Sequence, residues 1–190
     1  FFGALAHTKK LSEHLTHDIS IYGSTTNFKN PFITNYEVRK ESNLGLRTFL
    51  SWNKEIAGRN LQMQIGAEGT LGWNKIHNYD NDKGKPTQLQ AEDDLDNQTL
   101  TAFYRAQFEI LKNWNIEGSV GLNLNKIDFE KYFPTQEKGT IKFDSEWMPR
   151  IATNYEWRNM AWRISYAKGY STPTLSEVRS SDNIINTALQ

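Results

Sequence analysis

The strongest constraint on the fold is a two-residue alternation of apolar and polar side chains that recurs along most of the chain. The cleanest case runs from Leu61 to Trp73, where apolar residues and glycine at odd positions alternate with mostly polar residues at even positions. Successive side chains of a β-strand point to opposite faces of its sheet. The period therefore predicts a strand with one apolar and one polar face, and its recurrence predicts an all-β fold.

The same alternation predicts seven long strands and a partial first one. Several reach about ten residues, which is longer than the usual five or six. Short connections are expected near Lys10, over residues 53–60, which include Gly58, and near Asn113 and Arg158. Long polar loops are expected over residues 25–40, 77–97 and 128–140. This order predicts an antiparallel meander with short turns at one rim and long loops at the other. The predicted strands cover residues 1–7 (in part), 15–22, 44–52, 61–73, 100–110, 116–124, 147–157 and 161–170.

One segment has a second interpretation. Leu100, Phe103, Tyr104 and Phe108 also fall near helical spacing, so residues 99–114 are compatible with an amphipathic helix. The next segment, residues 116–124, contains two glycines in strict alternation, and glycine in a helix interior costs about 1 kcal/mol relative to alanine. The strand interpretation is therefore favoured for both segments.

Composition removes several classes of function. The 22 basic and 22 acidic side chains give a net charge of +0, so the chain has no overall positive charge for nucleic acid. With Cys 0, disulfides and thiolate metal or redox sites are excluded. No apolar run approaches the roughly 18 residues of a membrane-spanning helix. A membrane β-barrel is still allowed, because its apolar residues occupy only every second position.

The tryptophans point toward such a barrel. Trp52, Trp114, Trp157 and Trp162 all lie beside predicted short turns. Indole rings favour the membrane–water interface, where one side is apolar and the other is wet. The four residues are therefore predicted to form an interface girdle, although the core of a soluble β-barrel or sandwich remains an alternative at this point.

The polar side chains of the strands are predicted to share the opposite face, which would line the lumen of a barrel. No metal, cofactor or catalytic site is predicted, because the four histidines are scattered and the stretch from Asp80 to Gly84 lacks the ligand spacing of a calcium loop. Nucleophile and phosphate-loop motifs are also missing, so the chain is not expected to be an enzyme. The predicted lumen set is Arg47, Gln62, Gln64, Glu68, Arg105, Gln107, Glu109, Glu117, Arg150 and Arg163.

The stretch from Ala161 to Glu177 resembles a segment of TonB-dependent outer-membrane receptors. In that family a barrel strand ends in Gly and an aromatic residue, followed by Pro, Leu and an acidic residue. Residues 186–190 also resemble the start of the family's Asn-x-x-Leu-x-Pro-Glu stretch. The matching residues at the strand end are Gly169, Tyr170, Pro173, Leu175 and Glu177.

The resemblance implies a large transmembrane β-barrel of the bacterial outer membrane, closed around an N-terminal plug domain. It implies energised uptake of a scarce large ligand, such as a ferric siderophore, haem, cobalamin or an oligosaccharide. The implied partners are outer-membrane lipid, the plug, the remaining strands and an inner-membrane energising complex. On this interpretation residues 1–190 are a partial barrel domain, cut at both ends and without the plug. The alternatives are a passive porin-like barrel and a soluble β-rich extracellular binding module.

Overall fold

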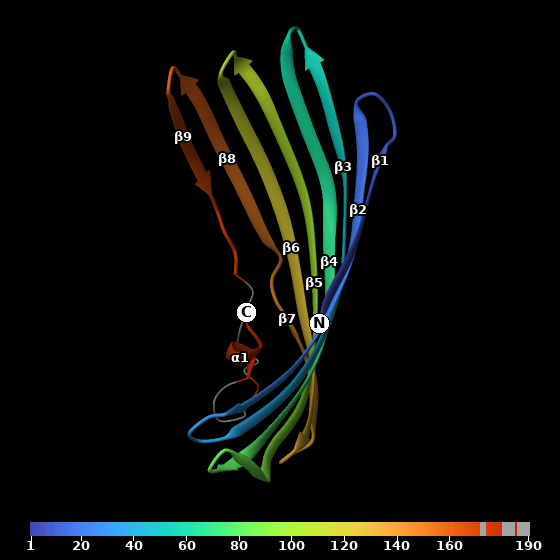
Figure 1. Ribbon diagram of the computed structural model, residues 1–190, viewed down its shortest axis with the longest axis vertical. Coiled ribbons are helices and arrows are strands. Elements are labelled where there is room, and N and C mark those ends of the chain that lie inside the picture. Colours follow the sequence, from blue (N-terminus) through green and yellow to red (C-terminus); the bar gives the residue numbers. More distant parts are fainter. Residues whose placement is uncertain (172–173, 180–184, 186–190) are drawn as a thin grey trace.

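Nine strands hydrogen-bond into one antiparallel sheet in the order β1-β2-β3-β4-β5-β6-β8-β9, with β7 paired to β6. The computed structural model describes residues 1–171, 174–179 and 185. Figure 1 shows the sheet as one curved wall, with the short helix α1 (Leu175–Val178) near its lower end. The strands are β1 (Phe2–Lys10), β2 (Leu15–Pro31), β3 (Tyr36–Ile56), β4 (Arg59–Asp82), β5 (Lys85–Leu111), β6 (Trp114–Phe133), β7 (Glu137–Lys142), β8 (Glu146–Trp157) and β9 (Met160–Ala167).

The short turns lie where the sequence predicts them. β3 and β4 are joined by Ala57 and Gly58, whose φ angles of 51° and 74° suit a tight hairpin with both central residues left-handed. Asn113 and Arg158 take positive φ in the β5–β6 and β8–β9 turns. The predicted antiparallel meander is confirmed, and so is strand rather than helix for β5.

The three predicted long loops are mostly wrong. β2 and β3 continue through most of residues 25–40, β4 and β5 meet at a tight turn at Lys83 and Gly84, and β6 pairs with the additional strand β7. The reason is that the alternation changes phase in these stretches. Ile76, Leu95 and Ile127 are buried, yet they lie on the face that is polar elsewhere in the sheet. Strands predicted from one continuous apolar face therefore end too early in the sequence.

The sheet has two different faces. The outer face carries Leu61, Met63 and Ile65, together with their cross-strand partners; the inner face carries Gln62 and Gln64 and receives the C-terminal segment. All ten residues of the predicted lumen set lie on the inner face, as their register shows. Within the described part of the chain, no helix combines the length and apolar character needed to cross a membrane.

Candidate functional surfaces of the wall

The outer face carries a broad apolar band. Ile65, Leu71, Leu100 and Ile151 are among the large apolar side chains that remain exposed there. At about 3.3 Å per residue and a tilt of about 45°, the stretch from Leu61 to Leu71 rises about 23 Å. That height is close to the roughly 25 Å apolar band of an outer-membrane barrel.

Three of the four predicted girdle tryptophans gather at the β5–β6 and β8–β9 turns. Trp114 and Trp162 both lie opposite Tyr155, and the rings of Trp114 and Tyr155 meet edge to face at 6.2 Å. The Trp114 Nε1–H donates to Thr153 Oγ1 at 2.7 Å. Trp157 lies beside the turn with the Arg158 guanidinium 4.7 Å from its ring centroid.

The fourth girdle residue lies apart from these three. Trp52 on β3 lies opposite Leu15 of β2 and Met63 of β4, closer to the β1–β2 connection. It is half-buried, whereas Trp162 is 61% exposed. The structure therefore brings three indoles to one corner of the wall and leaves Trp52 several residues along the strand from them.

The inner face holds a cluster of arginines around one carboxylate. Glu117 on β6 accepts a hydrogen bond from Arg105 Nη2 at 2.7 Å and another from Arg150. Its side chain is only 12% exposed, and its two oxygens are divided between the two guanidinium groups. Arg163 and Gln107 line the same hollow of about 260 Å³. Three guanidinium groups around one carboxylate leave this part of the wall positively charged.

A second polar group ties three strands together on the inner face. The Tyr22 hydroxyl of β2 donates to Glu68 Oε1 of β4 at 2.6 Å, and Arg47 of β3 lies 3.6 Å from the other carboxylate oxygen. The Tyr22 ring occupies the space above Gly45, where a side chain would collide with it. The glycine therefore allows the hydroxyl to reach across β3.

The acidic residue of the family-like motif caps the short helix α1. The backbone N–H and the hydroxyl of Thr174 both donate to Glu177 Oε2, at 2.6 and 3.0 Å, and Glu177 N–H donates back to Thr174 Oγ1. This reciprocal pattern is a capping box. The hydrogen bonds from the Thr174 backbone and side chain lower the pKa of Glu177, because they favour its charged form. The Thr-x-x-Glu spacing in the sequence is thus explained by local structure.

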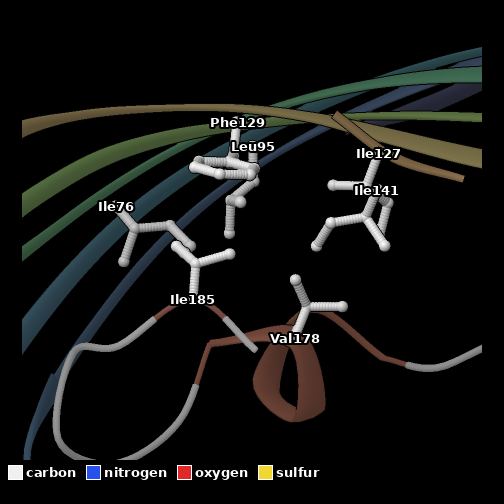
Figure 2. Packing of buried hydrophobic residues seen from close by; sticks show 7 residues of the cluster. All are labelled: Ile76, Leu95, Ile127, Phe129, Ile141, Val178 and Ile185. Carbon is white, nitrogen blue, oxygen red and sulfur yellow. The ribbon is translucent and has the colours of Figure 1, made fainter. Parts of the chain in front are cut away.

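The C-terminal segment is docked on the inner face by a small apolar core. Val178 of α1 and Ile185 pack against Ile76, Leu95 and Phe129 of the wall (Figure 2). Val178 and Leu95 are fully buried. This contact explains why the inner face of the wall carries buried apolar residues in this region.

A buried ion pair joins the same segment to the wall. Arg179 Nε donates to Asp93 Oδ2 at 2.6 Å, and the two side chains are 7% and 0% exposed. The sequence interpretation missed both residues, since Asp93 lies in a stretch predicted as loop. The available signal was Leu95, an apolar residue between acidic ones two positions along the same strand.

The motif residues themselves are only partly described. β9 ends at Ala167, so Gly169 and Tyr170 follow the strand, and Leu175 begins α1. Pro173 and residues 186–190 lie outside the described residues. Among the described residues, no group of three or more His, Asp or Glu side chains is placed to hold a metal ion.

Comparison with known proteins agrees with this geometry. The family described as TonB dependent receptor-like, beta-barrel matches residues 4–190. The ferric citrate transporter FecA in its unliganded form has a TM-score of 0.72 at 9% identity, covering 86% of this chain and 26% of that one. The siderophore receptor PiuA from Acinetobacter baumannii has a TM-score of 0.66 at 12% identity, covering 87% of this chain and 31% of that one. No curated protein matches the sequence.

These matches have different weight. At 9% and 12% identity, the two solved structures show a shared fold alone, and the chain spans less than a third of the length of either. The family match is independent of them and takes in almost all of the sequence. The chain therefore belongs to the TonB-dependent receptor family and is part of its β-barrel domain.

Proposed function

We propose that this chain forms part of the barrel wall of a bacterial outer-membrane transporter that takes up a scarce large ligand with energy from the inner membrane. The observation that carries the proposal is the family match over residues 4–190 on a wall with one apolar and one polar face. Ferric siderophores are the first ligand class to test, since both related structures are named for iron carriers. The role is transport rather than catalysis.

The edges of the sheet support the proposed partners. β1 and β9 are the end strands of the order, and within the described part of the chain each pairs with one neighbour only. Unpaired backbone groups cost several kcal/mol each in lipid, so both edges require the remaining strands of a closed barrel. The positive cluster of Arg105, Arg150 and Arg163 faces the interior, where we place the plug domain. The plug would also be the contact for the inner-membrane energising complex.

Uptake by the intact parent protein tests the function. The protein is expressed in a bacterial strain that lacks its own siderophore receptors, and accumulation of radiolabelled ferric siderophores is measured with and without a protonophore. We expect uptake that the protonophore abolishes, because the proposed transport is energised. Uptake that persists without a proton gradient would instead identify a passive porin-like barrel, and release of the parent protein in soluble form would favour the extracellular binding module.

The predicted tryptophan girdle has its own test. In the intact barrel reconstituted in lipid, Trp114, Trp157 and Trp162 are replaced one at a time by phenylalanine. The decrease in fluorescence after each replacement gives the contribution of that tryptophan to the total emission. We expect quenchers attached near the lipid headgroup to reduce each contribution more than quenchers at the acyl chain end, since indole rings favour the interface. Trp52, which lies apart from these three, serves as the comparison. Tryptophans insensitive to both quenchers would contradict the girdle.

A further inference from the structure

A group of asparagines lines a second hollow on the inner face of the wall. The hollow has a volume of about 270 Å³, and Thr174 lines it from the side of the C-terminal segment. Pockets for drug-sized ligands measure about 300–1,000 Å³, so this one suits a single small ring. Its amide side chains come from four neighbouring strands, namely Asn43 of β3, Asn74 of β4, Asn97 of β5 and Asn125 of β6.

Two of these amides turn their carbonyl oxygens toward the same glycine. Gly72 on β4 lies between its cross-strand partners Asn43 and Asn97, and a Cβ there would lie 2.8 and 2.2 Å from their Oδ1 atoms. Asn43 Nδ2 donates to Ser24 Oγ at 3.3 Å. Asn97 Oδ1 accepts from Asn74 Nδ2 at 3.1 Å. Reversing either amide would break a hydrogen bond, so two acceptors converge over the glycine.

A third acceptor at the hollow has no donor. Asn125 donates through its amide nitrogen to Asn123 Oδ1, and Asn123 Nδ2 donates in turn to Thr101 Oγ1 at 2.8 Å. This chain of donors fixes the orientation of the Asn125 amide. Its carbonyl oxygen is left without a hydrogen-bond partner among the described residues, although the residue is only 8% exposed. Buried carbonyl oxygens normally have a partner, so a ligand that brings a donor would complete this one.

The charged groups of the lining are already in ion pairs. Glu41 Oε1 lies 2.7 Å from Arg39 Nε, and Lys126 Nζ lies 2.8 Å from Asp128 Oδ2. Glu37 Oε1 is a further 3.5 Å neighbour of the same arginine, so two carboxylates share one guanidinium group beside the hollow. This arrangement disfavours an anionic ligand. A calcium ion would need several oxygen ligands that include free carboxylates, and the one carboxylate of the lining is bound to arginine.

Converging carbonyl oxygens without free charge select a neutral ligand with several hydroxyl donors. A sugar ring has this chemistry, and Phe143, which also lines the hollow, offers an apolar surface to its C–H groups. We propose that the hollow binds a neutral sugar ring of the transported ligand, with hydroxyl groups that donate to Asn43, Asn97 and Asn125. The inference rests on the proposed function, because a transported ligand would pass along the inner face.

Saturation-transfer difference NMR of the intact parent protein tests the site, in a detergent without a sugar headgroup. The probes are glucose, galactose and mannose, each titrated to give a dissociation constant. We expect at least one of these hexoses to bind. The uronic acid of the same sugar should bind about fivefold more weakly, because its carboxylate would lie near Glu37 and Glu41. Asn125→Leu, which removes an acceptor, and Gly72→Ala, which displaces two, should each weaken hexose binding at least about tenfold.

Matched controls separate the hollow from general effects. Asn154→Leu removes an inner-face amide that lines the arginine hollow instead, and Gly118→Ala adds a methyl group where nothing lies within 4 Å. Both should bind the hexose as the unmodified protein does, and the urea midpoint of every variant confirms that it is folded. The site is overturned if none of the hexoses binds, if the uronic acid binds equally well, or if Asn125→Leu and Gly72→Ala leave the affinity unchanged.

The proposed function is measured separately, by the energised uptake of ferric siderophores described above. Uptake that the protonophore abolishes, together with no binding of any hexose, would overturn the sugar site alone. Hexose binding that the two variants weaken, together with uptake that needs no proton gradient, would support the site and contradict energised transport.

Discussion

Replacing Asp93 with asparagine is expected to release the C-terminal segment from the inner face of the wall. Arg179 would then be left as a buried cation without its carboxylate, and breaking a buried ion pair from one side costs about 3–5 kcal/mol. Burial of the Val178 and Ile185 side chains stabilises the docked segment by about 3–6 kcal/mol, so the cost of the broken pair removes most of that gain. The segment should therefore detach rather than keep the charge buried.

Thiol labelling measures this release. The chain has Cys 0, so Val178→Cys introduces the one thiol of these 190 residues, at a fully buried position. In the intact barrel it should react slowly with a maleimide, and Asp93→Asn should accelerate the reaction by at least about a hundredfold. The paired change Asp93→Leu with Arg179→Leu should restore most of the protection, since neither charge remains.

An exposed ion pair provides the control for this experiment. Glu146→Gln breaks the contact with Lys168, whose atoms lie 2.6 Å apart but whose side chains are 30% and 54% exposed. Pairs of this kind contribute about 0–1 kcal/mol, so the labelling rate at position 178 should hardly change. Equal protection of the thiol with and without Asp93 would show that the ion pair does not hold the segment.

The second large effect is expected at Gly66 in the middle of β4. An added Cβ would lie 2.4 Å from Phe49 Cβ and 2.5 Å from the Thr48 carbonyl oxygen, and 2.8 Å from the Phe103 ring. The backbone contact cannot be relieved by a rotamer change. Gly66→Ala should therefore separate β3 and β4 locally and lower the free energy of unfolding by about 1–3 kcal/mol, as overpacking does elsewhere.

Urea unfolding of the intact barrel in detergent measures the change, with tryptophan fluorescence as the signal. Gly118→Ala is the matched control, because its added methyl group meets nothing within 4 Å. The midpoint for Gly118→Ala should agree with that of the unmodified protein, while that for Gly66→Ala should fall clearly below it. Equal midpoints for the two variants would mean that the sheet accommodates the added methyl group at Gly66 without a loss of stability.

The close packing around Gly66 also explains a break in the alternation of apolar and polar residues. Phe103 is the large apolar residue that departs from the alternation of β5, and it lies on the inner face opposite Gly66. Its ring and that of Phe49 are 6.4 Å apart, with the Arg47 guanidinium 5.5 Å from each. An aromatic pair over a glycine is a feature of cross-strand packing. It could not be predicted before the register of three strands was known.

Strand identity, the order of the meander and the short turns could be predicted from the sequence alone, because each depends on local properties. Alternation with period two marks a two-faced strand wherever one face is uniformly apolar, as from Leu61 to Trp73. Positive φ at Ala57 and Gly58 accompanies a turn that the sequence already places there. The polar inner face followed from the same alternation, since it is the complement of the apolar one.

Only the tertiary structure could show where the inner face of the sheet changes from polar to apolar side chains. Ile76, Leu95 and Phe129 are apolar residues on the inner face, where Val178 and Ile185 cover them. The covering residues lie up to about a hundred positions further along the chain, so the local sequence pattern does not indicate a strand there. The Asp93–Arg179 pair and the opposition of Lys126 and Lys142 likewise depend on which strands become neighbours. Sequence specifies each residue's local preference, whereas burial and charge pairing are set by contacts between distant parts of the chain.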